Sequence, residues 1–267
     1  MPEFPPEMLI YGCGNMGGAM LRGWLGAGVL ATHFTIVDPV AEDLPDGVSV
    51  HRSAAEVNRK FSTVLLGIKP QMLRLLAPDI ADLLTPDALV ISILAGSETA
   101  TLFAHFPDAK IVRLMPNLAA AIGKSPLGLF SQMLDSDDRT QLELMVAPLG
   151  TAIWLDEESQ MDAVTALAGS GPAFVYRFID ALAQGGVATG LPPDVAATLA
   201  MAMVEGAAAL AATSNERPAR LAARVTSPGG TTAAGLAILD NDNALEKLVT
   251  ATLQAARDRG AELAKGE

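Results

Sequence analysis

Eight short apolar runs divide the first 155 residues of this chain, and helical stretches lie between most of them. The runs are continuous and rich in β-branched residues, which is typical of strands covered on both faces. Strands that alternate with helices through short connections favour an α/β fold with a mainly parallel sheet. The predicted strands are Met8–Tyr11, Phe34–Val37, Val48–Val50, Thr63–Leu66, Leu89–Ile93, Ile111–Leu114, Gly128–Phe130 and Ile153–Leu155.

A different pattern begins near Asp162, where the strand signals stop and alanine-rich helical segments follow. One of these segments, Ala196–Ala212, carries a single charge at Glu205, so a helix there is apolar on nearly all sides and must be buried on nearly all of them. The helical segments that follow Asp162 make a small domain, which has little interior of its own in which to bury such a helix. We therefore expect an all-helical dimerisation domain covered by a second copy of the chain, alone or within a larger homo-oligomer. The predicted helices are Ala173–Gln184, Val195–Ala212, Thr232–Leu239 and Ala244–Leu263.

Composition excludes several classes of protein. Half of the residues are hydrophobic, which excludes a disordered chain, and the net charge of −12 argues against nucleic acid or an anionic membrane as partner. One cysteine and three scattered histidines provide neither a disulfide framework nor a metal site. The sequence shows no signal peptide and no uncharged apolar run of about 18 residues, so we expect a soluble, cytoplasmic protein with no membrane span.

The segment after the first predicted strand has the pattern G-x-G-x-x-G and opens the first helix. In that setting the first glycine permits a tight turn, the second lets a pyrophosphate approach the backbone, and the third lets the helix pack on the strand. A flexible glycine turn without a ligand is the alternative. The pattern predicts a Rossmann-type dinucleotide-binding domain over residues 1–158, followed by the helical domain over 159–267. Its cofactor-binding residues would be Gly12, Cys13, Gly14, Asn15, Met16 and Gly17.

Two further segments are expected to border the cofactor. Asp38 ends the second strand about 20 residues after Gly17, the spacing of a carboxylate that binds the adenosine ribose 2′-OH and favours NADH. No arginine or lysine follows Asp38 before Arg52, so this stretch shows no evident clamp for the 2′-phosphate of NADPH. The alternative is that Asp38 only starts a loop. The second segment follows the fourth strand and consists of Gly67, Ile68, Lys69 and Pro70, where Lys69 would contact a phosphate or ribose or simply be exposed.

In the helical half, Ser227-Pro228-Gly229-Gly230-Thr231-Thr232 leads into an apolar helix. The two glycines expose bare backbone amides and a threonine can cap the helix, so the turn is suited to a small carboxylate. A capped turn that binds nothing is the alternative.

Five ordered segments of the chain resemble the pyrroline-5-carboxylate reductase family, which catalyses the last step of proline synthesis. The resemblance covers nearly the whole chain and implies a nicotinamide-binding domain, a helical dimerisation domain and reduction of 1-pyrroline-5-carboxylate, a small cyclic imino acid, to L-proline by NAD(P)H. The segments are GCGNMG at 12–17, GIKPQ at 67–71, RLMPN at 113–117, DAVTALAGSGPAFVYRFIDALAQGGVATGLP at 162–192 and VTSPGGTTAAGLAILD at 225–240.

The resemblance also implies roles for particular residues. The backbone amides of Gly229, Gly230 and Thr231 would hold the substrate carboxylate, and Thr232, the candidate catalytic residue, would hydrogen-bond the ring nitrogen. The acidic residue that lies near the substrate in this family corresponds to Glu158.

This sequence departs from the family pattern at several places. Leu118-Ala119 follows Asn117 where the family has Thr-Pro, Ala54 lies in the stretch where an asparagine beside the cofactor ribose is common, and Arg224 replaces a smaller polar residue. The family generally accepts NADPH whereas Asp38 points to NADH, so both cofactors remain open.

Other functions also fit parts of the sequence, and one of them is another imine-reducing NAD(P) oxidoreductase. A β-hydroxyacid dehydrogenase shares the two-domain plan but needs a base, and the lysine of its motif would fall at Val175, counted from Gly171. A dinucleotide sensor or scaffold would retain the glycine turn at 12–17 but would not need the turn at 227–232.

Overall fold

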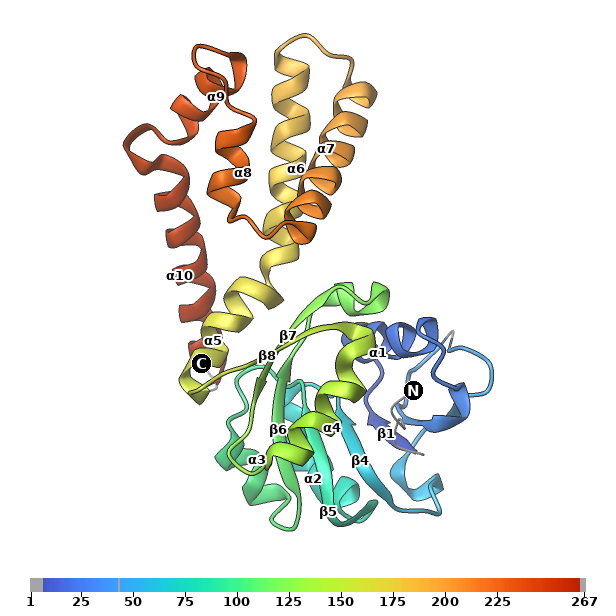
Figure 1. Ribbon diagram of the computed structural model, residues 1–267. Helices are drawn as coiled ribbons and strands as arrows, with labels where there is room; N and C mark the ends of the chain where they lie inside the picture. The colour runs from blue at the N-terminus through green and yellow to red at the C-terminus, as the bar shows by residue number, and fades with distance from the viewer. Residues whose placement is uncertain (1–6, 43, 265–267) are drawn as a thin grey trace. The chain divides into compact units, whose positions relative to one another are not determined.

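The computed structural model describes residues 7–42 and 44–264, and contacts divide the chain into two compact units (Figure 1). The first unit contains the described residues up to Gly169 together with those from Ala256 onward, and the second contains Ser170–Ala255. Residues 159–169 thus group by contact with the first unit, although the sequence analysis assigns them to the helical domain. A functional boundary at residue 158 stays a prediction.

The first unit is built on one eight-stranded sheet with the order β3-β2-β1-β4-β5-β6-β7-β8. Strands β1 to β6 are parallel to one another, β7 is antiparallel to β6, and β8 is parallel to β7. The order 3-2-1-4-5-6 is that of the Rossmann fold, so the predicted α/β class is confirmed. The strands are β1 (Met8–Tyr11), β2 (Phe34–Val37), β3 (Ser49–His51), β4 (Phe61–Leu66), β5 (Leu84–Ser92), β6 (Lys110–Met115), β7 (Ser125–Phe130) and β8 (Gly150–Trp154).

Both faces of the sheet are covered by hydrophobic packing. In β1, Met8 and Ile10 belong to one core cluster, whereas Leu9 and Tyr11 belong to a second cluster on the other face. Successive side chains of a strand point to opposite faces, so a strand buried on both sides needs an unbroken apolar run. The helices of this unit are α1 (Asn15–Gly26), α2 (Leu73–Ala81), α3 (Thr99–His105), α4 (Ser136–Val146) and α5 (Met161–Val164).

The stretch before β5 differs from the expectation. Helix α2 ends at Ala81 and β5 begins at Leu84, five residues before the predicted strand. Leu84 pairs with Phe61 of β4, and the register then shifts around Asp87, which has a φ of +59°. This additional pairing across the irregular stretch is a tertiary contact that the local pattern did not indicate.

The second unit is all helical, as predicted (Figure 1). Helices α6 and α7 lie side by side, and the lack of a side chain at Gly186 brings it against Ala196, because a Cβ there would lie 3.1 Å from the Ala196 Cβ. The unit contains α6 (Gly171–Ala188), α7 (Pro193–Thr213), α8 (Pro218–Arg224) and α9 (Thr231–Leu239); α10 (Ala244–Ala264) begins in it and ends among the residues grouped with the first unit.

Helix α7 is apolar on almost every side, but its own unit covers little of it. Only Ala196 and Ala200 are buried, while Leu199, Met203 and Leu210 are each at least half exposed. Among the described residues, α7 is the one helix whose length and composition would suffice to cross a membrane. No such segment was expected from the sequence, because Glu205 interrupts the apolar run.

Candidate functional site

The glycine turn after β1 packs directly against the segment that follows β4. Gly12 has a φ of +90°, and a Cβ on it would lie 2.8 Å from backbone atoms of Gly67 and Ile68. A Cβ on Gly67 would in turn lie 2.3 Å from the Gly12 carbonyl oxygen. The two predicted cofactor segments are therefore in backbone contact, and neither glycine can carry a side chain without moving the other segment.

The same turn leaves an open surface at the start of α1. Gly14 precedes the helix without a capping side chain, and no heavy atom lies within 4 Å of the place where its Cβ would be. Gly17, by contrast, is in close contact, because a Cβ on it would lie 2.8 Å from the Gly12 carbonyl oxygen. The first backbone N–H groups of a helix have no partner within the helix, and here they begin at Asn15 and Met16. This uncapped cradle fits the pyrophosphate of a dinucleotide.

Asp38 links the end of β2 to the glycine turn. Its Oδ2 accepts a hydrogen bond from the Cys13 backbone N–H at 2.7 Å, and its Oδ1 accepts one from the Val40 N–H at 2.9 Å. The carboxylate is 7% exposed. Asp38 therefore does start the loop after β2, and it also faces the turn, where the sequence places the ribose.

Cys13 is not a nucleophile in this turn. Burial, followed by the charge of Asp38, raises the pKa of the Cys13 thiol to about 11, although the charge of Arg22 opposes this. The thiol is thus protonated at neutral pH. This agrees with its interpretation as the small residue of the motif.

A cavity of about 290 Å³ lies between the glycine turn and the loop after β2. It adjoins the carboxyl ends of β1 and β2, the edge at which doubly wound sheets bind ligands. Arg22 also lines this cavity and was not predicted from the sequence. Its position four residues after Gly18 could have indicated this, because residues i and i+4 lie on the same face of a helix. The lining residues are Cys13, Gly14, Asn15, Gly18, Leu21, Arg22, Asp38, Val40, Ala41, Glu42, Leu44 and Pro45.

Arg52 holds the loop that borders this cavity. Its Nη1 donates to the Ala41 carbonyl oxygen at 2.8 Å and lies 3.4 Å from that of Asp38. Lys69 and Pro70 are exposed at the same edge of the sheet, so their cofactor role rests on position alone. Ala54 begins a short 3-10 turn and its methyl group packs on the core, so the side-chain amide of the family's asparagine is missing here.

Glu158 lies in a polar cluster at the carboxyl ends of β5 and β6. Its Oε1 accepts hydrogen bonds from the Arg113 guanidinium at 2.8 Å, the Thr99 backbone N–H at 2.7 Å and the Thr99 hydroxyl at 2.8 Å. Burial alone would raise the pKa of this carboxyl, but the bonds from Arg113 and Thr99 together hold the pKa below its ordinary value. Arg113 is only 4% exposed, and neither partner of Glu158 was predicted from the sequence.

Asn117, next to the unusual Leu118-Ala119, has a structural role. Its Oδ1 accepts from the Ala119 N–H at 2.9 Å, and its Nδ2 donates to the Ala168 carbonyl oxygen at 2.9 Å. The end of β6 is thereby joined to the π-helical turn at Thr165–Gly169. The Leu118 side chain is exposed, and Ala119 supplies a backbone N–H that a proline at this position would lack.

The turn between α8 and α9 leaves the start of the helix open, and the threonine cap expected from the sequence is not formed. No side chain caps α9, and Thr231 and Thr232 in its first turn are exposed. Gly229 has a φ of +72°, whereas the Gly230 N–H already donates to the Ser227 carbonyl oxygen at 3.0 Å. A Cβ on Gly230 would lie 2.4 Å from the Ser227 Oγ, so Gly230 shapes the turn by its lack of a side chain.

Arg224, the last residue of α8, precedes this turn and forms an exposed ion pair with Glu216 at 3.4 Å.

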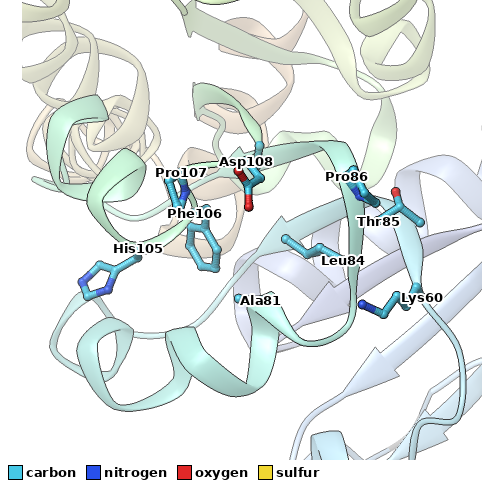
Figure 2. Close-up of a pocket in the computed structure, with 10 residues that line it drawn as sticks. Lys60, Ala81, Leu84, Thr85, Pro86, His105, Phe106, Pro107 and Asp108 are labelled. Carbon is cyan, nitrogen blue, oxygen red and sulfur yellow. The ribbon is translucent and has the colours of Figure 1, made fainter.

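A second cavity, of about 230 Å³, lies at the opposite edge of the sheet and is shown in Figure 2. Its walls come from the amino end of β5 and from the segments before β4, β5 and β6, whereas ligands of this fold class bind at the carboxyl ends of the strands. Figure 2 shows the His105 ring turned away from the other labelled side chains. The lining residues are Lys60, Ala81, Leu84, Thr85, Pro86, His105, Phe106, Pro107, Asp108 and Ala109. Across residues 7–42 and 44–264, no group of three or more metal-ligating side chains occurs.

Comparisons with known proteins match both halves of the chain. A family model described as "Pyrroline-5-carboxylate reductase dimerisation" matches residues 158–263, and one described as "NADP oxidoreductase coenzyme F420-dependent" matches residues 8–96. The pyrroline-5-carboxylate reductase of Pseudomonas aeruginosa is 35% identical over 97% of each chain, and that of Glycine max is 37% identical over 92% of each.

Solved structures of pyrroline-5-carboxylate reductases are also similar to this chain. The pyrroline-5-carboxylate reductase of Coxiella burnetii has a TM-score of 0.89 at 28% identity and covers 98% of this chain and 99% of its own. The pyrroline carboxylate reductase of Plasmodium falciparum, solved with NADP bound, has a TM-score of 0.85 at 25% identity and 99% coverage of both chains.

Proposed function

The chain belongs to the pyrroline-5-carboxylate reductase family, and we propose that it reduces the C=N bond of 1-pyrroline-5-carboxylate to form L-proline in proline biosynthesis. It is an NAD(P)H-dependent oxidoreductase that acts on a cyclic imine. The main support for this function is the similarity to curated reductases of the family over nearly the full length of the chain. The Pseudomonas aeruginosa enzyme, for example, is 35% identical across 97% of the chain. When bound, the nicotinamide cofactor supplies the hydride for the imine carbon.

The first unit supports the proposal by providing the cofactor cradle. Gly12, Gly14 and Gly17 keep side chains away from the start of α1, so that its N–H groups can hold the pyrophosphate. We assign Cys13, Asn15, Met16 and the segment Gly67-Ile68-Lys69-Pro70 to the same site. Asp38 would accept a hydrogen bond from the ribose 2′-OH, which favours NADH.

The second unit supports the proposed function by providing a turn, at residues 227–232, that could bind the substrate. The amides of Gly229 and Thr231 would hold the substrate carboxylate, while Gly230 would contribute the shape of the turn because its own N–H is engaged. The Thr232 hydroxyl would hydrogen-bond the ring nitrogen and so orient the imine, which is a positioning task.

Glu158 is one of the proposed substrate-binding residues, and its role there would be that of a permanent negative charge. Because its pKa is lowered, it is ionised at neutral pH and has no proton to give. A protonated iminium accepts hydride readily, so the reaction does not require a strong acid from the protein. A β-hydroxyacid dehydrogenase, the alternative, needs a base where this chain has the apolar Val175.

A single assay tests the function. The purified protein should oxidise NADH or NADPH with 1-pyrroline-5-carboxylate as acceptor and release proline, and it should not reduce NAD⁺ or NADP⁺ with 3-hydroxyacids as donors. Comparing kcat/KM for the two cofactors with the same imine determines the preference, for which Asp38 predicts NADH. Activity with 3-hydroxyacids in place of the imine would contradict the assignment.

We further propose that the second unit forms a homodimer, alone or within a larger assembly. The support is the exposed apolar surface of α7 together with the family model named for dimerisation, which spans this helix. A partner helix would cover α7, so the membrane-like composition does not require a lipid environment. A cytoplasmic location, with no nucleic-acid partner, is proposed on the same grounds and on the net charge of −12.

A further inference from the structure

Arg22 extends back over the first turns of α1 into the cavity beside Asp38. A Cβ on Gly18 would lie 3.4 Å from the Arg22 Nη1, so the guanidinium lies over a position that has no side chain. Helical side chains lean toward the helix N-terminus, which explains how residue 22 reaches a site made by residues 13–18. Arg22 is exposed and lines the 290 Å³ cavity with Asp38, Val40 and Ala41.

The lining of this cavity includes two acidic side chains, Asp38 and Glu42, and one cation, Arg22. Two backbone N–H groups hold the Asp38 carboxylate in place. In the part of the chain that the structure describes, no hydrogen bond or ion pair engages the Arg22 guanidinium, and its N–H donors remain available for a ligand. Arg52 differs, because its Nη1 already donates to the Ala41 carbonyl oxygen.

The chemistry of dinucleotide cofactors suggests a function for Asp38 and Arg22 together. The helix start would hold the pyrophosphate, and the ribose next to it carries either a hydroxyl or a phosphate at its 2′ position. A hydroxyl suits a carboxylate, but a 2′-phosphate beside Asp38 would be repelled unless a cation lies within reach. A guanidinium presents several N–H donors that match phosphate oxygens.

We propose that Arg22 binds the 2′-phosphate of NADPH and thereby lets this chain accept NADPH as well as NADH although Asp38 is present. The inference rests on the proposed function only in that the cavity receives the adenosine ribose of the cofactor. It makes Arg22 a specificity-determining residue with no part in the hydride transfer.

Calorimetric titration with oxidised cofactors tests the proposal without catalysis. Arg22→Ala should weaken NADP⁺ binding about tenfold, the effect expected from one charge-assisted contact, and change NAD⁺ binding less than about twofold. Arg22→Lys, which keeps the charge but not the forked donors, should fall between Arg22→Ala and the unaltered protein. The probe 2′,5′-ADP, which lacks the pyrophosphate, should lose affinity for Arg22→Ala as NADP⁺ does, whereas 5′-AMP should not.

The matched control is Lys60→Ala, which removes one positive charge beside the cavity at the other edge of the sheet. It should leave both cofactor affinities unchanged. Arg22→Ala itself should fold normally, because alanine is a good helix former at an exposed position. Equal loss for NADP⁺ and NAD⁺, or no loss for either, would overturn the proposal.

These outcomes are separable from those of the function assay. If the unaltered protein fails to reduce 1-pyrroline-5-carboxylate with either cofactor, the proposed function fails, yet the ratio of NADP⁺ to NAD⁺ affinities still decides the role of Arg22. If the protein is active and Arg22→Ala loses both cofactors alike, only the inference about Arg22 fails.

Discussion

At the scale of single residues, the positions with the strictest requirements are glycines that let two backbones touch. Gly12 and Gly67 approach each other so closely that a Cβ on either would overlap the other segment. The glycine turn therefore serves the packing of β1 against β4 as well as any ligand. A loss of cofactor binding on substitution has to be separated from a loss of stability.

Replacing Gly12 with alanine should reduce both the stability of the protein and its affinity for the cofactor. The substitution adds a clash at 2.8 Å and a strained φ of +90°, for which we expect a cost of about 2 kcal/mol and a fall in melting temperature of about 5 °C. Differential scanning calorimetry gives the temperature, and titration with NADH and NADPH should show both weakened. Gly26→Ala is the control, because nothing lies within 4 Å of the added atom. A variant at Gly12 as stable as this control would contradict the close approach.

Thr232 carries the most specific residue-level prediction about chemistry. Thr232→Ala should lower kcat/KM for the imine by about 10- to 100-fold, the effect of losing one hydrogen bond to a charged group, and leave cofactor affinity nearly unchanged. Thr232→Ser should recover most of the activity because it keeps the hydroxyl. Steady-state kinetics and cofactor titration together check this, and unchanged activity in Thr232→Ala would remove Thr232 from the catalytic assignment.

At the scale of secondary-structure elements, one ion pair holds three segments together. Arg113 belongs to β6, Thr99 begins α3, and Glu158 lies in the short turn before α5. The carboxylate of Glu158 thereby joins the carboxyl end of β6 to the start of α3. Its loss would leave a buried guanidinium at Arg113 without its counter-charge.

The stability from this pair should depend on pH. A carboxyl group whose pKa is lowered on folding stabilises the protein above its ordinary pKa of 4.5, and this contribution is lost as the pH falls through the lowered value. Glu158→Gln should therefore destabilise the protein by about 1 to 2 kcal/mol at pH 7, because Glu158 is partly exposed and glutamine keeps an acceptor oxygen, and the difference should shrink below pH 4.5.

Thermal unfolding of both proteins across this pH range measures the difference. Glu246→Gln, an exposed position on α10, is the control for simple removal of a charge. A difference that is constant with pH would mean that the pair does not act through ionisation of Glu158.

At the scale of the whole molecule, local dipoles must work against the overall charge. The net charge of −12 repels anions at a distance, yet both the cofactor and the substrate are anionic. We expect the open helix starts at Asn15 and Thr231 to provide the local N–H groups that such ligands need. The net charge therefore argues against polyanionic partners and says little about small anions in a shaped site.

The exposed apolar surface of α7 predicts an oligomer. Light scattering should give at least twice the 27.6 kDa mass of one chain, and Met203→Glu should reduce that mass because a charge would be buried at the interface. Leu75→Glu, at an exposed apolar position of α2, should leave the mass unchanged. Circular dichroism verifies that both variants stay helical. A 27.6 kDa species at micromolar concentration in the unaltered protein would contradict the dimer.

Much of this protein follows from its sequence alone. Periodicity and turn residues act locally, so all eight strands, the helical second unit and the placement of the two glycine-rich turns could be predicted without coordinates. The family follows equally well, because the motifs at 12–17 and 225–240 are ordered along the chain. The helix α8 and the start of β5 were missed because a short helix and an irregular strand have weak local signals.

The contacts between distant residues were decided only by the tertiary structure. Glu158 lies 45 residues after Arg113 and 59 after Thr99, and no local pattern could pair them. The use of the Gly230 N–H within its own turn and the position of Arg22 over Gly18 depend on backbone and side-chain geometry that residue types leave undetermined. Sequence patterns record which elements form, because those depend on near neighbours, whereas the partners of a buried charge depend on how the elements pack.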